Sequence, residues 1–293
     1  MSEPLRWDEL QLFDPGPESI MEARTKAVEK PVWSEHKADL IARYLRYFVF
    51  VTRHGTYIDA FAGPQTDRSS MAWTAELVLS SEPKWLRHFH LFDNDPAQVE
   101  RLQRLRELHA DRDVTVYPPG DSNRQLPAVL PAGSIGEREA SFCLLDQRTF
   151  ECEWQLCRHV ALLRPGQTKV EQFYFLANSW LPRALSAVST AATEDKVQRW
   201  LGDENWRYFA QLSPLERVQT FIEKFKGALS YRFVRAWPIY GRTGGRGVVM
   251  YYMIHATDHR EAAKLMYRAY NKAVDPPEPS EQLELLLDGV MLD

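Results

Sequence analysis

The sequence predicts an α/β fold in which a seven-stranded, mostly parallel sheet carries a helical insert and is closed by an antiparallel hairpin. Three observations lead to this prediction. Short apolar runs alternate with helical patterns over residues 55–177, residues 179–229 contain helical patterns only, and two late apolar runs flank the glycine-rich turn Gly241–Arg246. Strands joined by helical crossovers indicate a parallel sheet with helices on both faces, whereas a hairpin is antiparallel by construction.

The individual strands are predicted from apolar runs bounded by turn residues. Strands joined by crossovers cover residues 55–60, 88–92, 114–117, 140–145 and 170–177, and the hairpin strands cover 231–240 and 247–256. Helices are predicted over residues 71–79, 96–109, 154–163 and 260–273, with two or three more in the insert at 179–229. Crossover strands, a helical insert and a closing hairpin, in this order, form the strand programme of the Rossmann-like class I methyltransferases.

A further helix is predicted ahead of the first strand. Its apolar residues recur at spacings of three and four from Leu40 to Val49, which is the pattern of one buried helix face. Ser34 is expected to cap its start, and Gly55 is expected to take the left-handed position past its end.

Composition indicates a soluble globular protein. The 293 residues are 44% apolar and 26% charged, with a mean hydropathy of −0.42. No apolar run approaches the roughly 20 residues that span a bilayer. Residues 1–4 lack the basic-then-apolar layout of a signal peptide, and three cysteines are not expected to form a disulfide framework. We therefore expect a cytoplasmic protein without membrane association. A net charge of −4 disfavours nucleic acid as the main partner without excluding a local basic groove.

The chain divides into three parts at the sequence level. Residues 1–28 lack periodicity and are expected to form an N-terminal arm. Residues 29–274 carry the strand and helix patterns of the single domain. Residues 275–293 form an acidic, leucine-rich tail that is expected to dock on the body or on a partner helix.

The first candidate site follows the first strand, because ligands of an open α/β sheet bind at the carboxyl ends of its strands. The segment reads Asp59-Ala60-Phe61-Ala62-Gly63-Pro64. Its small residues let a ligand approach the backbone, and Asp59 can bind the ammonium of an amino-acid-like cofactor. It is not the GxGxxG fingerprint, which disfavours an NAD-dependent oxidoreductase. The alternative is a tight turn that Asp59 caps.

Acidic residues also follow the second and third strands. Asp93 is placed to accept the ribose hydroxyls of a nucleoside, while Asp95 is expected to cap the helix that begins at Pro96. Asp121, followed by Ser122, is placed to accept the exocyclic amine of adenine, although Asp and Ser are also common turn residues. With the strand programme, these residues predict S-adenosyl-L-methionine as the cofactor.

In such a fold the end of the fourth strand faces the transferred methyl group, and the end of the fifth strand can line the acceptor pocket. Asp146 is the predicted catalytic residue, to orient the acceptor or take its proton, and Arg148 is a predicted substrate ligand. The Asp/Asn-Pro-Pro-aromatic signature of nucleic-acid amino-methyltransferases is absent. Asn178 is a second catalytic candidate, and the alternative is that it caps the next helix.

The segment from Trp33 to Pro64, W-x2-H-K-x2-L-x3-Y-L leading into Y-I-D-A-F-A-G-P, resembles the three-Cys-motif partner (TcmP) proteins. G-D-S-N, L-L-D, F-L-A-N-S-W-L-P-R and the hairpin V-V-M-Y-Y-M-I-H-A-T follow in that family's order, so the resemblance covers about residues 30–272. It implies a methyltransferase-like activity and a partner protein, encoded nearby, that bears a three-cysteine cluster. It also makes His36 and Lys37 candidate substrate ligands near the first strand end.

Two departures from the family pattern motivate a second hypothesis. Gln65 stands where the family has glycine, and Asp146-Gln147-Arg148-Thr149 stands where it has Asp-Pro, an aromatic residue and glycine. A catalytically degenerate binding subunit of a modification or defence complex, built on the same fold, is therefore the alternative function.

Two further groups of residues have competing interpretations. Arginines interleave with aromatic residues in the hairpin, a pattern that can grip a nucleic-acid strand or protect a sheet edge, and the edge is favoured slightly. They are Arg232, Arg235, Trp237, Tyr240, Arg242 and Arg246, of which Arg242 and Arg246 are predicted substrate ligands. Cys152 and Cys157, with His159 nearby, have a spacing at the loose edge of zinc sites, and no metal site is predicted.

Overall fold

The structure is a computed structural model that describes residues 32–64, 73–164, 166, 168–241 and 248–274. Several predictions fall outside the described residues. They concern the N-terminal arm, Gln65, Arg242, Arg246 and the acidic tail.

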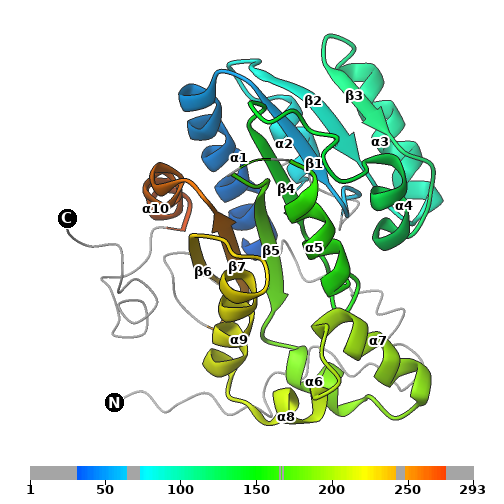
Figure 1. The fold of residues 1–293 in the computed structure, drawn as a ribbon. Coiled ribbons are helices and arrows are strands. Elements are labelled where there is room, and N and C mark those ends of the chain that lie inside the picture. Colours follow the sequence, from blue (N-terminus) through cyan, green and yellow to red (C-terminus); the bar gives the residue numbers. More distant parts are fainter. Residues whose placement is uncertain (1–31, 65–72, 165, 167, 242–247, 275–293) are drawn as a thin grey trace. The chain divides into compact units, whose positions relative to one another are not determined.

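One seven-stranded sheet organises the described chain, with the strand order β3-β2-β1-β4-β5-β7-β6. The strands are β1 Gly55–Asp59, β2 Leu86–Leu91, β3 Asp113–Val116, β4 Ser141–Leu145, β5 Glu171–Ala177, β6 Phe233–Tyr240 and β7 Val249–Thr257. The first five strands are parallel, and β7 runs antiparallel to both β5 and β6 (Figure 1). The predicted fold class is confirmed, including the antiparallel closure of a mostly parallel sheet.

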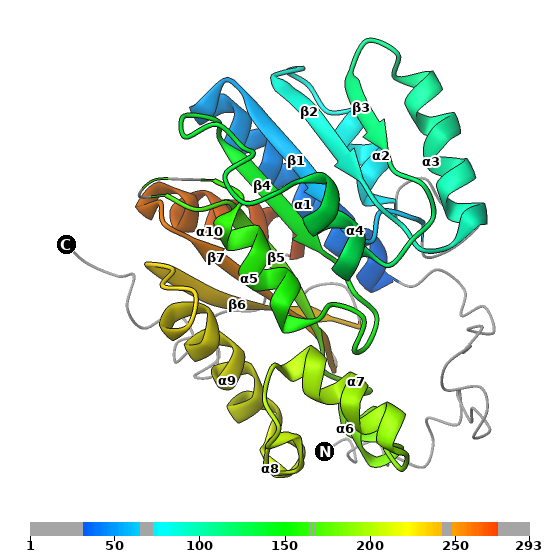
Figure 2. The ribbon, with the colours of Figure 1, turned by 45° about the vertical axis from the view of Figure 1, so that its right-hand side comes forward.

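Helices cover both faces of this sheet (Figure 2). They are α1 Val32–Thr52, α2 Thr74–Leu79, α3 Pro96–Leu108, α4 Ser122–Val129, α5 Trp154–Leu162, α6 Leu181–Ser186, α7 Ala191–Leu201, α8 Trp206–Gln211, α9 Pro214–Gly227 and α10 Arg260–Val274. One core cluster joins α1, α2, α3 and α10 to the sheet, and a second joins α4, α5, α7 and α9 to the opposite face. None of these described helices is both long and apolar enough to cross a membrane.

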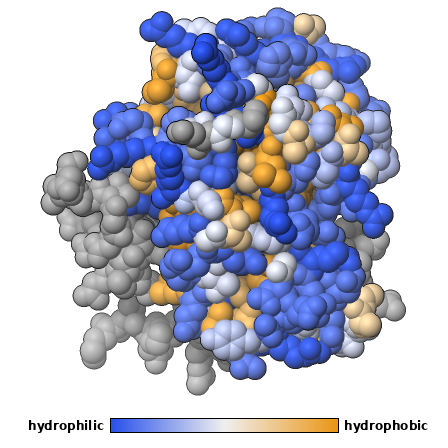
Figure 3. All heavy atoms as spheres, viewed as in Figure 1, coloured by the Kyte–Doolittle hydropathy of each residue, from blue (hydrophilic) through white to orange (hydrophobic). Residues whose placement is uncertain are grey.

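The central strands are buried along their whole length because both of their faces are covered. Every residue of β1, β4 and β5 is buried. Neighbouring side chains alternate between the two cores, so Tyr57 packs in one cluster and Ile58 in the other. Hydrophilic side chains cover most of the face in Figure 3, and apolar ones show in smaller groups between them.

The ends of α1 differ from the sequence prediction. The helix begins at Val32, so Ser34 lies inside it and is not the N-cap. The left-handed residue past its end is Arg53, with φ 60°, and Gly55 is already the first residue of β1. A Cβ at Gly55 would lie 2.9 Å from Phe48 Cε1, so close packing requires this glycine, and a left-handed backbone does not.

The helical content also exceeds the prediction in two places. The insert holds four helices, α6 to α9, because capping boxes at Thr190 and Ser213 start two of them separately. Helix α4 was not predicted from the sequence. It contains Pro127, a residue that normally argues against a helix interior.

Candidate cofactor cleft

A cleft of about 300 Å³ lies at the carboxyl ends of the parallel strands. Four strand ends line it, those of β1, β2, β3 and β4, and α7 of the insert supplies another wall. The lining residues are Phe61, Gly63, Pro64, Asp93, Asn94, Asp95, Gln98, Asp121, Ser122, Asn123, Asp146, Arg148, Phe150, Glu151, Glu153, Lys196 and Arg199. The cleft lies where ligands of open α/β sheets bind, and it has the size of a small ligand pocket.

Asp59 lies beneath the cleft and is not among its lining residues. It is 1% exposed, and its carboxylate accepts hydrogen bonds from the Tyr57 hydroxyl at 2.8 Å and the Phe61 backbone N–H at 3.1 Å. Burial raises the pKa of Asp59 to about 7, although the Tyr57 hydrogen bond opposes the rise. The carboxylate thus holds the turn after β1, the alternative that the sequence left open. A direct contact with a cofactor ammonium stays a prediction.

The turn after β1 brings backbone groups to the cleft. Phe61, Gly63 and Pro64 line it, whereas Ala62 is buried and donates its N–H to the Phe92 carbonyl at 2.8 Å. The Gly63 N–H donates to Asp93 Oδ2 at 2.8 Å. A Cβ at Gly63 would lie 2.4 Å from that oxygen, so only glycine permits this close approach.

The two acids after β2 have separate roles. Asp95 caps α3, its carboxylate accepting from the Ala97 N–H at 2.8 Å, which confirms its predicted role. Asp93 is half-buried in the cleft wall and accepts from the N–H groups of Gly63 and Asp95. Burial raises the pKa of Asp93, and these two hydrogen bonds oppose the rise. Asp93 is therefore the acid that the turn fixes at the cleft.

The segment after β3 lines the cleft as the start of α4. Asp121 caps the helix by accepting from the Asn123 N–H at 3.0 Å. The buried Ser122 hydroxyl donates to the Ala60 carbonyl, which ties α4 to the turn after β1. Asp121 therefore has the turn role that the sequence left open, and its contact with adenine stays a prediction.

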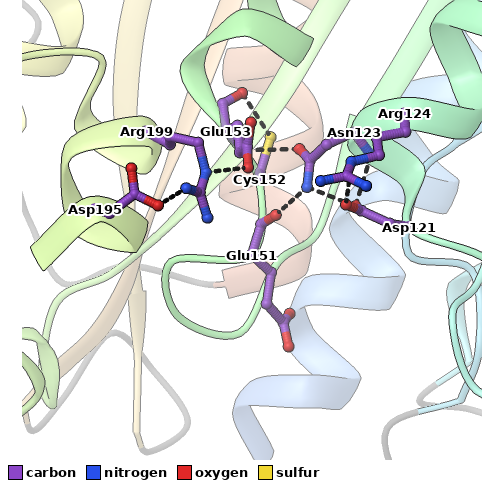
Figure 4. Close-up of polar contacts among 8 residues, drawn as sticks. All are labelled: Asp121, Asn123, Arg124, Glu151, Cys152, Glu153, Asp195 and Arg199. Atoms are coloured by element: carbon purple, nitrogen blue, oxygen red, sulfur yellow. Dashed lines mark hydrogen bonds and ion pairs between the residues drawn. The ribbon is translucent and has the colours of Figure 1, made fainter. Parts of the chain in front are cut away.

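Asn123, which the sequence analysis missed, joins three parts of the cleft wall (Figure 4). Its Nδ2 donates to the Glu151 carbonyl at 2.8 Å, and its Oδ1 accepts from the Glu153 N–H at 2.8 Å. Glu153 in turn accepts from Arg199 Nε of α7 at 2.7 Å. The start of α4, the loop after β4 and the insert are thereby connected. An Asn two residues after a capping Asp carries no sequence signal for such a role.

The loop after β4 is ordered by Gln147. Its buried side chain accepts hydrogen bonds from the N–H groups of Cys152 at 2.9 Å and Glu151 at 3.2 Å. Phe150 has a left-handed backbone, with φ 54°. Its ring packs against the ring of Trp200 of α7, with centroids 4.8 Å apart. Left-handed residues other than glycine are uncommon and cluster at functional sites. Gln147 thus orders the loop that carries the cleft-lining residues Arg148, Phe150 and Glu151.

Asp146 and Lys37 form a buried ion pair at the cleft. Lys37 Nζ lies 2.7 Å from Asp146 Oδ2, and the two side chains are 2% and 9% exposed. The ammonium also lies over the rings of Phe175 and Tyr251, 5.0 and 5.3 Å from their centroids. The Lys37 side chain therefore extends to the end of β4 and not to the protein surface. The side chain of its neighbour His36 lies outside the described residues.

Asn178 does not line the cleft. Its backbone N–H donates to the Met250 carbonyl at 3.0 Å, and its side chain donates to the Val249 carbonyl at 3.4 Å. It does not cap α6 either, because the residue at that position is Trp180. The antiparallel pairing of β5 with β7 draws Asn178 toward β7 instead.

Of the arginine-aromatic group, Arg235, Trp237 and Tyr240 lie on β6, an edge strand of the sheet, which agrees with the favoured interpretation. Trp237 is 1% exposed and packs against Tyr270 with ring centroids 5.0 Å apart. Its ring is therefore not available for stacking on a base.

The three cysteines are core residues. Cys143, Cys152 and Cys157 are buried, and the last two sulfur atoms are 3.9 Å apart. His159 Nε2 instead forms a 2.7 Å hydrogen bond with the Leu130 carbonyl. Among the residues that the structure describes, no cluster of three metal-ligating side chains occurs.

No family model and no curated protein matches this chain. Among solved structures, it is similar to the CurJ carbon methyltransferase, with a TM-score of 0.41 and 14% identity over 71% of this chain and 49% of that chain. It is also similar to the protein LPL1258 of Legionella pneumophila, described as a DUF519 family model, with a TM-score of 0.44 and 11% identity over 85% of this chain and 95% of that one. The chain spans about half the length of the CurJ chain. We base the fold class on strand order and register.

Proposed function

We propose that this chain is an S-adenosyl-L-methionine-dependent methyltransferase of the TcmP type. The observation that carries the proposal is the pair Gly63 and Asp93, which join the β1 and β2 ends by a 2.8 Å hydrogen bond at the cleft. An acid fixed at the end of the second strand is the arrangement that binds the ribose hydroxyls of a nucleoside. The strand order β3-β2-β1-β4-β5-β7-β6, with its antiparallel closing strand, supports the proposal.

The described residues fit this cofactor in two ways. The absence of a side chain at Gly63 lets Asp93 approach the backbone, since a Cβ would lie 2.4 Å from Asp93 Oδ2, and the buried Gln98 Oε1 has no hydrogen-bond partner in the described chain. Six carboxylates line the cleft, which suits a cofactor bearing a sulfonium and an ammonium. We assign the methionine end to Phe61, Gly63 and Pro64, above Asp59. The ribose is assigned to Asp93 and the adenine to Asp121 and Ser122.

The cofactor supplies an activated methyl group, and the protein supplies alignment. Rate enhancement in such a site comes mainly from holding the acceptor in line with the methyl group. Asp146 is the residue proposed to orient the acceptor or take its proton. Lys37 is proposed as a positioning residue, because its ammonium fixes the Asp146 carboxylate at 2.7 Å.

The resemblance to the TcmP proteins adds a partner to the proposal. The motifs that carry the resemblance lie at the cleft or beside it: D-A-F-A-G-P after β1, G-D-S-N at the start of α4, and the hairpin strand β7. The resemblance implies a partner protein encoded nearby, and we propose that the complex is cytoplasmic. The methyl acceptor is then a nucleic acid or another substrate that the partner delivers.

A second function is favoured by the loop after β4. Gln147 and Arg148 replace the family's Pro and aromatic residue, and Asp146 is already held by Lys37. A degenerate binding subunit of a modification or defence complex would keep the cleft and lose methyl transfer. It predicts a stable complex with a partner and no transfer of label from methyl-labelled cofactor to cell extract or nucleic acid. Transfer that Asp146→Asn abolishes would instead establish the enzyme.

The two acids of one turn provide a matched test of cofactor binding. Asp93→Ala should weaken the affinity for S-adenosylhomocysteine by about tenfold or more, because it removes the ribose acceptor. Asp95→Ala should cost about 1 kcal/mol of stability through the lost helix cap and leave the affinity within about twofold. Isothermal titration calorimetry measures both. Equal affinities for wild type and Asp93→Ala would refute the ribose assignment.

A further inference from the structure

The carboxylates of the cleft are all engaged by the protein. Six carboxylates and three basic side chains line it. Each carboxylate accepts at least one hydrogen bond from a backbone N–H or a basic side chain. Each acidic side chain of the lining therefore has a protein donor before any ligand binds, and its remaining lone pairs can accept from a ligand.

Two of the three basic side chains differ from this pattern. Arg199 is paired with Glu153, at 2.7 Å, and with Asp195 (Figure 4). The guanidinium of Arg148 and the ammonium of Lys196 form no hydrogen bond or ion pair with any residue in the described part of the chain. Arg148 is exposed and Lys196 is half-buried, so both cationic groups are accessible from the cleft and attract a ligand of opposite charge.

The two cations face the cleft from adjoining walls. Arg148 follows Asp146, and its positive charge opposes the rise that burial causes in the pKa of both Asp93 and Tyr251. Lys196 is half-buried on α7, one turn before Trp200 and on the same helix face. The contact between Trp200 and Phe150 holds that face against the loop that carries Arg148.

We infer that Arg148 and Lys196 bind an anionic group, a phosphate or a carboxylate, of the methyl acceptor. This inference rests on the proposed function and names the substrate class of the same cleft. Arg148 supplies a planar, bidentate donor for an oxyanion, and Lys196 adds a point charge. Because Arg148 lies two residues after Asp146 in the loop that follows β4, the anion would be held on the acceptor side of the transferred methyl group.

The test compares three full-length proteins. They are the wild type, the double variant Arg148→Gln/Lys196→Gln and the control Lys226→Gln, which alters an exposed lysine on α9. Calorimetry first measures the affinity of each protein for S-adenosylhomocysteine and for 5′-methylthioadenosine, which lacks the amino-acid end. Inorganic phosphate and succinate are then titrated into each protein saturated with S-adenosylhomocysteine, at constant ionic strength. The tighter of the two anions indicates the acceptor's anionic group.

We expect the double variant to bind the preferred anion about tenfold more weakly or worse than wild type, with Lys226→Gln within about twofold. Affinity for S-adenosylhomocysteine should change by less than about twofold in all three proteins. Equal anion binding by wild type and the double variant would overturn the inference. So would a loss of affinity for S-adenosylhomocysteine but not 5′-methylthioadenosine, since the cations would then hold the cofactor carboxylate. If folded wild type does not bind S-adenosylhomocysteine, the proposed function fails instead.

Discussion

At the residue scale, the turn after β1 depends on one glycine and two acids. Gly63 donates its N–H to Asp93 and leaves no room for a side chain, while Asp59 fixes the same turn from below. The sequence pattern identified all three positions because each follows a strand. It could not tell which acid faces the cleft, because that depends on the local path of the chain around the strand end.

Gly63→Ala should disturb the site more than it disturbs the fold. The new Cβ would lie 2.4 Å from Asp93 Oδ2 and 2.6 Å from Gln98 Cβ, so Asp93 must move. We expect affinity for S-adenosylhomocysteine to fall by about tenfold or more and stability to fall by about 1–3 kcal/mol. Calorimetry and urea denaturation measure these effects. Gly227→Ala is the matched control, because nothing lies within 4 Å of its added Cβ, and it should stabilise α9 by up to about 1 kcal/mol.

The buried Asp59 predicts a pH dependence of stability. Its pKa rises from 3.8 to about 7 on folding, so the folded chain holds this proton more tightly than the unfolded chain. Its contribution to stability is therefore full below about pH 4 and is lost as the pH rises through about 7. The difference in unfolding free energy between wild type and Asp59→Asn should shrink by up to about 4 kcal/mol across this window. Urea denaturation from pH 4 to pH 8 tests it, and a difference that stays constant would contradict the assignment.

At the scale of elements, α1 is joined to the end of β4 by the buried pair Lys37 and Asp146. Lys37→Met leaves a buried carboxylate without its partner and should cost about 3–5 kcal/mol. The double variant Lys37→Met/Asp146→Asn removes that charge and should be more stable than Lys37→Met alone. A double-mutant cycle by chemical denaturation measures the coupling, expected at about 1 kcal/mol or more. Additive effects would mean that the pair contributes no mutual stabilisation.

Helix α7 is attached to the cleft by one apolar and one polar contact. Trp200 is 2% exposed and packs on Phe150, whereas Arg199 is 47% exposed and pairs with Glu153. Trp200→Ala should therefore cost about 3–5 kcal/mol and Arg199→Ala less than about 1 kcal/mol. Guanidinium denaturation of both variants tests this order. Equal losses would show that the ion pair is more than a screened surface contact.

At the scale of the whole molecule, the fold was predictable because strands and crossover helices leave periodic patterns. The details that escaped prediction depend on contacts distant in sequence. Helix α4 was hidden by Pro127 and forms because Asp121 and Asn123 anchor its start against the β4 loop.

The cleft residues of the helical insert also escaped prediction because their position depends on contacts distant in sequence. Lys196 and Arg199 belong to the insert and reach the cleft only because α7 packs on the β4 loop. Asn178 follows a strand, as the site residues do, but its strand pairs with β7 and turns it away. Sequence position identifies strand ends, while tertiary packing decides which of them face the ligand.

A crystal structure of the chain with S-adenosylhomocysteine tests the central claim most directly, because it shows ligand and cleft together. We expect the ribose hydroxyls at Asp93, the adenine beside Asp121 and the sulfur between Gly63 and Asp146. Ligand bound elsewhere, or a cleft without ligand at saturating concentration in a correctly folded sheet, would contradict the account.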